Sequence, residues 1–98
     1  MCGATKGGVS LDGVDVSKEA IVQGVVLADG EPVSPAYVRL LDKTGEFTAE
    51  VPTSATGQFR FFAGDGQWTL RALAPRHEAV DRTIVAKIGE ITEVEITV

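Results

Sequence analysis

Hydrophobic and polar residues alternate along most of the chain after residue 19, in short runs that turn residues separate. Alternation with a period of two and many β-branched or aromatic residues is typical of half-buried β-strands. The seven runs cover residues 20–27, 36–42, 46–53, 58–63, 67–74, 79–87 and 90–98. No helical period extends beyond about two turns. The pattern therefore predicts an all-β fold, a seven-stranded antiparallel β-sandwich.

The alternation also predicts which side chains fill the core. We expect the inward set to be Val22, Val26, Ala36, Val38, Leu40, Phe47, Ala49, Val51, Phe59, Phe61, Trp68, Leu70, Ala72, Val94, Ile96 and Val98. Trp68 is the largest of these, and its truncation is expected to cost most, on the order of 3 kcal/mol. Gly24 lies inside a strand and indicates a bulge or a close backbone approach. Glu93 and Glu95 point outward, where they would discourage edge-to-edge pairing if the last strand ends a sheet.

The chain divides into two unequal parts. Residues 1–19 contain four glycines and scattered charges without a sustained period. We expect them to form an N-terminal tail that is flexible at least to about residue 10. Residues 20–98 make up the predicted β-sandwich domain, and a chain of 98 residues suits one such domain.

A series of motifs runs through the predicted strands: V-x-G-x-V at 22–26, D-G-x-P-V at 29–33, A-x-V-x-L at 36–40, G-x-F-x-F at 57–61 after Thr53 and Thr56, and G-x-W-T-L-x-A at 66–72. Together they resemble the carboxypeptidase-regulatory-like, or transthyretin-like, sandwich. Domains of this kind serve as spacers, binding modules and accessory domains. The resemblance therefore implies a fold and leaves the function open.

A second resemblance concerns the whole chain. The start Met-Cys-Gly and the segments EFTAEV (46–51), SATGQFRFFA (54–63) and GQWTLRALAP (66–75) resemble a small actinobacterial family of uncharacterised proteins. That family is associated with sulfur metabolism through thiosulfate sulfurtransferases of the rhodanese type. The resemblance implies a cytoplasmic accessory protein that handles thiosulfate or sulfane sulfur with such a sulfurtransferase as its partner. It implies no rhodanese catalysis, because the cysteine-containing active-site loop of that enzyme is absent here.

Charge and composition narrow the classes of partner. The net charge of −5 and the pI of about 4.7 argue against binding to nucleic acid, which needs a basic surface. No apolar run is long enough to span a bilayer, and the start of the chain lacks the hydrophobic segment of a signal peptide. We therefore expect no nucleic-acid partner, no membrane partner and a cytoplasmic location, where a single thiol stays reduced.

Cys2 is the only cysteine and the one candidate for covalent chemistry. Removal of the initiator methionine would place an α-ammonium group beside the thiol, and a nearby positive charge favours the thiolate. Such a thiolate would accept a sulfane sulfur as a persulfide and pass it to another enzyme. The alternative is that Cys2 is an incidental residue on a loose tail.

Three arginines, Arg39, Arg60 and Arg71, lie at outward positions of predicted strands. If they are neighbours on one sheet, they form a face that binds sulfate, thiosulfate or an acidic partner. The alternative is that each pairs across strands with a carboxylate such as Glu50. His77, the only histidine, lies in a predicted loop.

One histidine and one cysteine do not make a zinc site, and no base accompanies the hydroxyl groups. We therefore predict no metal and no cofactor. Enzyme activity stays open as a third possibility, for which the sequence shows no base–nucleophile pair.

Two functions follow from these observations. The first is an accessory protein of sulfur metabolism that carries sulfur on Cys2 for a sulfurtransferase. The alternative is a non-catalytic β-sandwich that binds a protein partner and gives the cysteine no role. In either case we expect a monomer or a homodimer that pairs through an edge strand.

Overall fold

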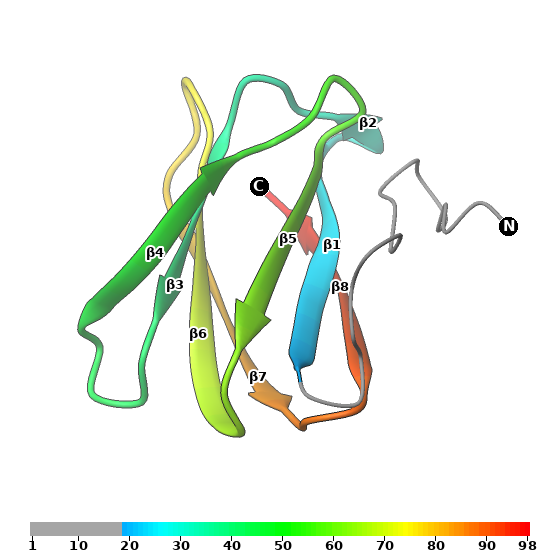
Figure 1. Cartoon of the computed structure of the whole chain (residues 1–98). Helices are drawn as coiled ribbons and strands as arrows, with labels where there is room; N and C mark the ends of the chain where they lie inside the picture. The colour runs from blue at the N-terminus through cyan, green and yellow to red at the C-terminus, as the bar shows by residue number, and fades with distance from the viewer. Residues whose placement is uncertain (1–18) are drawn as a thin grey trace, which may run out of the picture.

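The computed structural model describes residues 19–98, and these residues form eight β-strands. The strands are β1 (Ala20–Ala28), β2 (Glu31–Pro32), β3 (Tyr37–Leu41), β4 (Phe47–Pro52), β5 (Gln58–Ala63), β6 (Gly66–Leu73), β7 (Val80–Ala86) and β8 (Ile91–Thr97). One sheet contains β5, β1, β8 and the short β2, and the other has the order β4-β3-β6-β7 (Figure 1). The predicted all-β sandwich is therefore confirmed, with eight strands rather than seven. The added strand, β2, pairs with the end of β1 inside a segment that we expected to be a turn.

Strand β1 is the centre of its sheet. It pairs with β5 in antiparallel fashion, from Ala20↔Ala63 to Val25↔Gln58. It pairs with β8 in parallel fashion, from Ile21↔Ile91 to Leu27↔Thr97. The expectation of a purely antiparallel arrangement therefore fails for this pair. Side chains alternate with the same period in parallel and antiparallel strands, so the pattern carried no information about direction.

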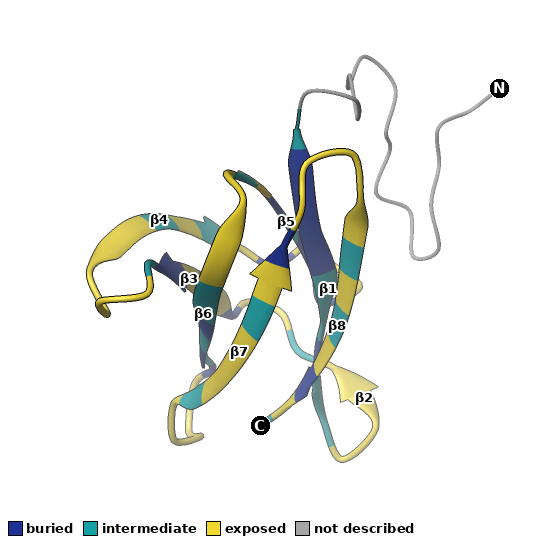
Figure 2. Cartoon of the chain, turned by 90° about the horizontal axis from the view of Figure 1, so that it is seen from below, coloured by how far each residue is buried: buried dark blue, intermediate teal, exposed yellow. Residues whose placement is uncertain are grey.

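The core lies between the two sheets, where their inward side chains meet. It consists of Ala20, Val22, Val26, Ala36, Val38, Leu40, Phe59, Phe61, Leu70, Ala72, Ala74, Ala86 and Ile96. Figure 2 shows β1 buried along most of its length, whereas β4, β7 and β8 are mostly exposed. Two sheets stacked about 10 Å apart leave room for one such layer of interlocked side chains.

A β-bulge changes the orientation of one predicted core residue. The register between β3 and β4 shifts after Leu40, which pairs with Ala49, so that Leu41 pairs with Phe47. The extra residue reverses the alternation at the start of β4. Phe47 was expected to face the core but lies on the outer surface, where 61% of it is exposed.

Trp68 is also less buried than we expected. Its ring packs against the core from a partly exposed position, and its Nε1 donates a hydrogen bond to the carbonyl oxygen of Gly64 over 2.9 Å. The prediction that its truncation would cost most therefore loses its basis, because Leu40, Leu70 and Ile96 are fully buried.

One further prediction can be compared with the structure, and another lies outside the residues that it describes. Gly24 was expected to mark a bulge or a close approach, and a Cβ at this position would overlap the backbone carbonyl oxygen of Val94 in β8. The predicted tail over residues 1–19 lies outside the described residues except for Glu19. Within residues 19–98, no helix is long and apolar enough to cross a membrane.

Candidate functional site

Four charged side chains form a row across the outer face of the β4-β3-β6-β7 sheet. In the strand register, Arg39 of β3 lies opposite Glu50 of β4 on one side and Arg71 of β6 on the other. Arg71 in turn lies opposite Asp81 of β7. We call Glu50, Arg39, Arg71 and Asp81 the arginine rung. In β3, β4 and β6 these side chains point outward because the residues on either side of them face the core, and Asp81 of β7 follows Val80, which packs against the core.

Both arginines of the arginine rung are paired with carboxylates. Arg39 Nε lies 2.7 Å from Glu50 Oε2. Arg71 donates through Nε and Nη2 to the two oxygens of Asp81, over 2.8 and 3.0 Å. This forked hydrogen bond raises the pKa of Arg71 and lowers the pKa of Asp81, and the attraction between the charges acts in the same directions. Exposed pairs of this kind contribute at most about 1 kcal/mol to stability. The fold therefore depends little on them, and their main effect is on the chemistry of this surface.

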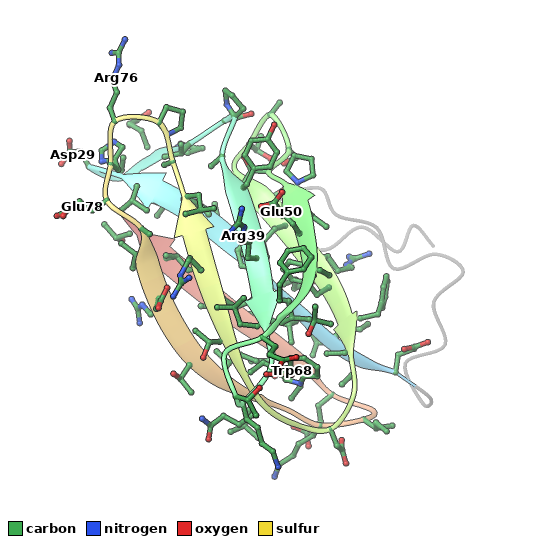
Figure 3. All side chains as sticks on the ribbon, turned by 90° about the vertical axis from the view of Figure 1, so that its left-hand side faces the viewer. Asp29, Arg39, Glu50, Trp68, Arg76 and Glu78 are labelled. Atoms are coloured by element: carbon green, nitrogen blue, oxygen red, sulfur yellow. The ribbon has the colours of Figure 1, made fainter. Side chains whose placement is uncertain are left out.

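Two aromatic side chains flank the arginine rung. Tyr37 precedes Arg39 on the same face of β3, and 47% of it is exposed. Phe47 lies on the other side, with its ring centroid 5.9 Å from the guanidinium carbon of Arg39. Figure 3 looks onto this sheet and shows Arg39 and Glu50 pointing toward each other near its centre. We call the arginine rung with Tyr37 and Phe47 the aromatic–arginine face.

The three arginines singled out in the sequence do not share one face. Arg39 and Arg71 are direct neighbours, as a shared binding face requires. Arg60 lies on β5 in the other sheet, where its Nε donates to Gln23 Oε1 over 3.1 Å. Since the guanidinium groups of Arg39 and Arg71 already bind carboxylates, an anion would compete with Glu50 and Asp81 for them. Cys2, the candidate sulfur acceptor, lies outside the described residues.

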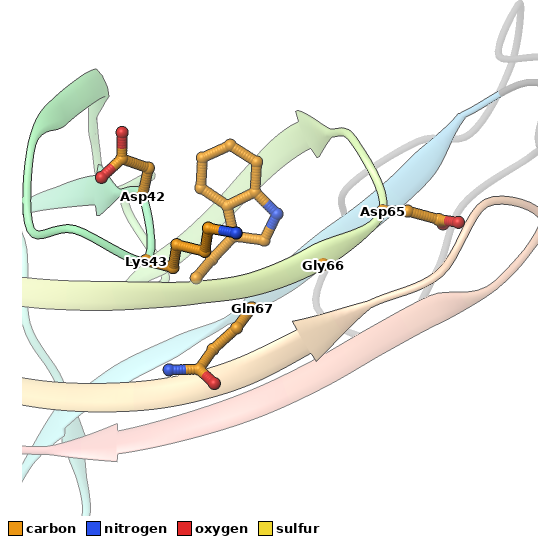
Figure 4. A pocket seen from close by; sticks show the side chains of 6 residues that line it. Asp42, Lys43, Asp65, Gly66 and Gln67 are labelled. Carbon is orange, nitrogen blue, oxygen red and sulfur yellow. The ribbon is translucent and has the colours of Figure 1, made fainter.

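A shallow hollow of about 280 Å³ lies at one end of the sandwich (Figure 4). Its lining includes Trp68, Asp42 and Asp65. Asp42 accepts hydrogen bonds from the hydroxyl and amide of Thr44, and these bonds lower its pKa. Asp65 accepts from the amide of Ile88 over 2.6 Å. Both carboxylates therefore stabilise turns.

Other candidates for chemistry stay apart in the described part of the chain. His77 lies exposed in the turn between β6 and β7, where its amide donates to the carbonyl oxygen of Ala74. Residues 19–98 contain no group of three or more histidine, cysteine, aspartate or glutamate side chains that could hold a metal ion.

Sequence reasoning missed three members of the aromatic–arginine face, since Tyr37 was not singled out as a site residue. Phe47 was assigned to the core because a bulge is invisible to a strict alternation. Asp81 was not recognised as a partner of Arg71. A signal for that pair exists, since both residues lie at the same distance along the chain from Arg76, the centre of the turn between the two strands.

Comparison with known families supplies the context for this fold. Residues 2–98 match the family described as "Protein of unknown function (DUF1416)". The chain belongs to the DUF1416 family. The uncharacterized proteins Rv0814c and Rv3118 of Mycobacterium tuberculosis (strain ATCC 25618 / H37Rv) are each 52% identical to it over 101 residues, which cover 99% of this chain and 100% of the relative. The prediction of an uncharacterised family is confirmed in these terms.

Solved structures similar to this DUF1416 protein share its fold at low sequence identity. The major pilin subunit BcpA of Bacillus cereus superposes with a TM-score of 0.71 and 18% identity, covering 82% of this chain and 28% of the pilin. A DUF3823 family protein from Parabacteroides merdae superposes with a TM-score of 0.60 and 21% identity, covering 83% of this chain and 46% of that protein. These likenesses support the β-sandwich and carry no information about activity.

Proposed function

We propose that this DUF1416 protein is a non-catalytic β-sandwich module that binds a protein partner through the aromatic–arginine face. The observation that carries the proposal is the exposure of Tyr37 and Phe47 on either side of two adjacent arginines. Tyrosine, phenylalanine and arginine are enriched at protein–protein interfaces, and tyrosine and arginine dominate their binding energy.

The charges of this face favour a protein over a polyanion. Each guanidinium of the arginine rung is balanced by a carboxylate, so the row has no net charge. A polyanion needs an excess of positive charge. A protein surface with mixed polar and apolar groups matches this face better, because the arginine stems and aromatic rings bury apolar area while the paired charges fix the orientation.

Photo-crosslinking in the producing cells tests this proposal. A photoreactive phenylalanine derivative at Tyr37 replaces one exposed aromatic ring with another, and we expect it to form a discrete adduct with one partner. Adding Arg39→Ala should lower the adduct yield by about tenfold or more, since truncating a central interface arginine costs about 2 kcal/mol. Electrophoresis with mass spectrometry of the adduct band measures both results.

The same photoreactive residue at Arg76 is the matched control. Arg76 is exposed at the tip of the turn between β6 and β7 and points away from the sheets (Figure 3). We expect no adduct from this position. Equal adducts from Arg76 and Tyr37, or an adduct at Tyr37 that Arg39→Ala leaves unchanged, would contradict the proposal.

We propose as a second candidate that the protein carries sulfane sulfur on Cys2 for a rhodanese-type sulfurtransferase in the cytoplasm. The observation in its favour is that the match to the DUF1416 family begins at Cys2, the only thiol of the chain. The Cys2 thiolate would attack the outer sulfur of the persulfide on the sulfurtransferase. A sulfur–sulfur bond then forms at Cys2, the donor's sulfur–sulfur bond breaks, and the electron pair leaves with the donor thiolate. The transfer needs no external oxidant.

Mass spectrometry of the intact protein tests this second candidate. After incubation with thiosulfate and a rhodanese-type sulfurtransferase, we expect the wild type to gain the mass of one sulfur atom and to lose it on reduction. The Cys2→Ser variant should gain none, and its crosslinking through Tyr37 should be unchanged. A wild type without the added mass, or a Cys2→Ser variant that keeps it, would rule out the carrier role.

A further inference from the structure

The outer face of the β5-β1-β8 sheet contains buried residues that lie outside the core. Ile21 and Gln23 of β1 alternate with the core residue Val22, so they point away from the opposite sheet. Ile21 is nevertheless 0% exposed and Gln23 is 5% exposed. Ile21 does not belong to the core cluster, and the second sheet lies on the other side of β1. We call this surface the β1 outer face.

The neighbours of these residues form two rows across the sheet. Ile21 lies between Phe62 of β5 and Ile91 of β8, and both of these apolar side chains are partly exposed at its edges. Gln23 lies between Arg60 and Glu93 in the same way.

The side chains in the second row are bonded to one another across the strands. Gln23 donates through Nε2 to Glu93 over 3.2 Å and accepts from Arg60. The Nη2 atom of Arg60 is buried, and this burial lowers the pKa of its guanidinium. The outer face of a two-layer sandwich is normally open to water, and charged groups are seldom buried there. Burial at its centre therefore indicates that another segment covers it.

The start of β1 points to the covering segment. The carbonyl oxygen of Glu19 accepts a hydrogen bond from the amide of Gly89 over 2.9 Å, and the amide of Ile21 donates to Glu90 over 3.1 Å. These bonds fix the entry of the chain beside the turn between β7 and β8, next to Ile21. Any chain that precedes Glu19 therefore begins at the edge of the β1 outer face.

Residues 1–18 have the length and the composition to cover this face. An extended stretch of eight residues spans about 26 Å, which exceeds the ladder between β1 and β5. The segment contains the apolar residues Val9, Leu11, Val14 and Val16. The match to the DUF1416 family begins at residue 2, so these residues belong to the length that the family shares. A short tether also gives the segment a high effective concentration at the face, about millimolar.

We propose that residues 9–16 dock on the β1 outer face of their own chain and cover Ile21 and Gln23 with apolar side chains of this segment. The docked segment turns the β5-β1-β8 sheet into an inner layer and leaves the aromatic–arginine face as the open side of the molecule. This proposal is independent of the partner binding proposed for the aromatic–arginine face, because it concerns the opposite sheet.

Thiol labelling measures the cover directly. Ile21→Cys is introduced with Cys2→Ser, and its reaction with a maleimide is compared with that of Val85→Cys, an exposed position on the outer face of β7. We expect Ile21→Cys to react more slowly by about tenfold or more, because labelling requires local opening. Removing residues 1–18 should abolish most of this difference and leave Val85→Cys unchanged. Equal rates in the full chain, or a slow rate that survives the deletion, would overturn the proposal.

A second measurement applies where the shortened chain loses its fold. A nitroxide is attached to Leu11→Cys in the full-length Cys2→Ser protein, and the amide signals of the sheets are compared by NMR. We expect selective broadening at Ile21, Phe62 and Ile91, with little effect at Arg39. In a control, nitrogen-15-labelled protein without nitroxide is mixed with unlabelled protein that carries the nitroxide. Broadening in this mixture would show that a second copy of the chain occupies the face. That result, or uniform broadening of both sheets, would contradict docking of the chain on itself.

Discussion

Replacing Gly24 with alanine is expected to destabilise the protein by about 3 kcal/mol. The added methyl group would overlap the carbonyl oxygen of Val94 and lie 3.0 Å from Cζ of Phe59. Relief requires the parallel β1–β8 pair to separate, and these backbones are held together from Ile21 to Leu27. Alanine also restricts the unfolded chain, but that effect stabilises by only about 0.4–1 kcal/mol. For a domain of this size, each kcal/mol lowers Tm by about 4–8 °C, which thermal unfolding followed by circular dichroism will detect.

Gly64→Ala is the matched control for this prediction. Gly64 is exposed, and a Cβ at its position would meet no atom within 4 Å. We expect a change within about 0.5 kcal/mol, as for most surface substitutions. If Gly24→Ala is as mild as Gly64→Ala, then β8 does not approach β1 as closely as the structure describes.

The same glycine shows what sequence reasoning can and cannot recover about the fold. A lone glycine within an alternating strand predicted a bulge or a close backbone approach, and the structure shows the close approach. The identity of the approaching strand was out of reach, because β8 follows β1 by most of the chain length and the two are parallel. Local patterns identify strands and their faces. Pairing over long sequence separations depends on how the two sheets assemble.

The candidate site was recoverable to a similar degree. Alternation alone placed Arg39 and Arg71 outward, and their ion pairs with carboxylates follow the alternative that cross-strand pairing suggested. Alternation could not assign Arg60 to a sheet, because the sequence of a strand does not show which of the two sheets the strand joins. The aromatic–arginine face also depends on the bulge that turns Phe47 outward, and a bulge is one extra residue with no compositional signal here.

The burial of Ile21 was missed for a different reason. A strand that is buried on both faces reads as a nearly continuous hydrophobic run, and AIVQGVVLA fits that description better than strict alternation does. The interruption by Gln23 favoured an alternating interpretation. In the structure, this glutamine satisfies its amide by bonding to Arg60 and Glu93 at either side.

Replacing Leu40 with alanine is expected to cost about 2–5 kcal/mol of stability, while the same change at Phe47 should cost about 1 kcal/mol or less. Leu40 is fully buried within the core cluster, so its truncation removes apolar contacts and leaves a cavity. Phe47 loses mainly its contact with Arg39, because most of its ring already faces water. Urea unfolding of both variants measures the difference in their free energies of unfolding. If the slope of this free energy against urea concentration is the same for both, the two variants expose similar surface on unfolding and can be compared.

This pair of variants decides between two registers of β4. A strand without the bulge would place Phe47 inside with Ala49 and Val51, as strict alternation predicts. Truncating a buried phenylalanine costs about 3–5 kcal/mol, so Phe47→Ala would then equal or exceed Leu40→Ala. With the bulge after Leu40, the order is reversed and the phenylalanine is available to a partner. A large loss of stability in Phe47→Ala would therefore contradict both the bulge and the aromatic–arginine face that depends on it.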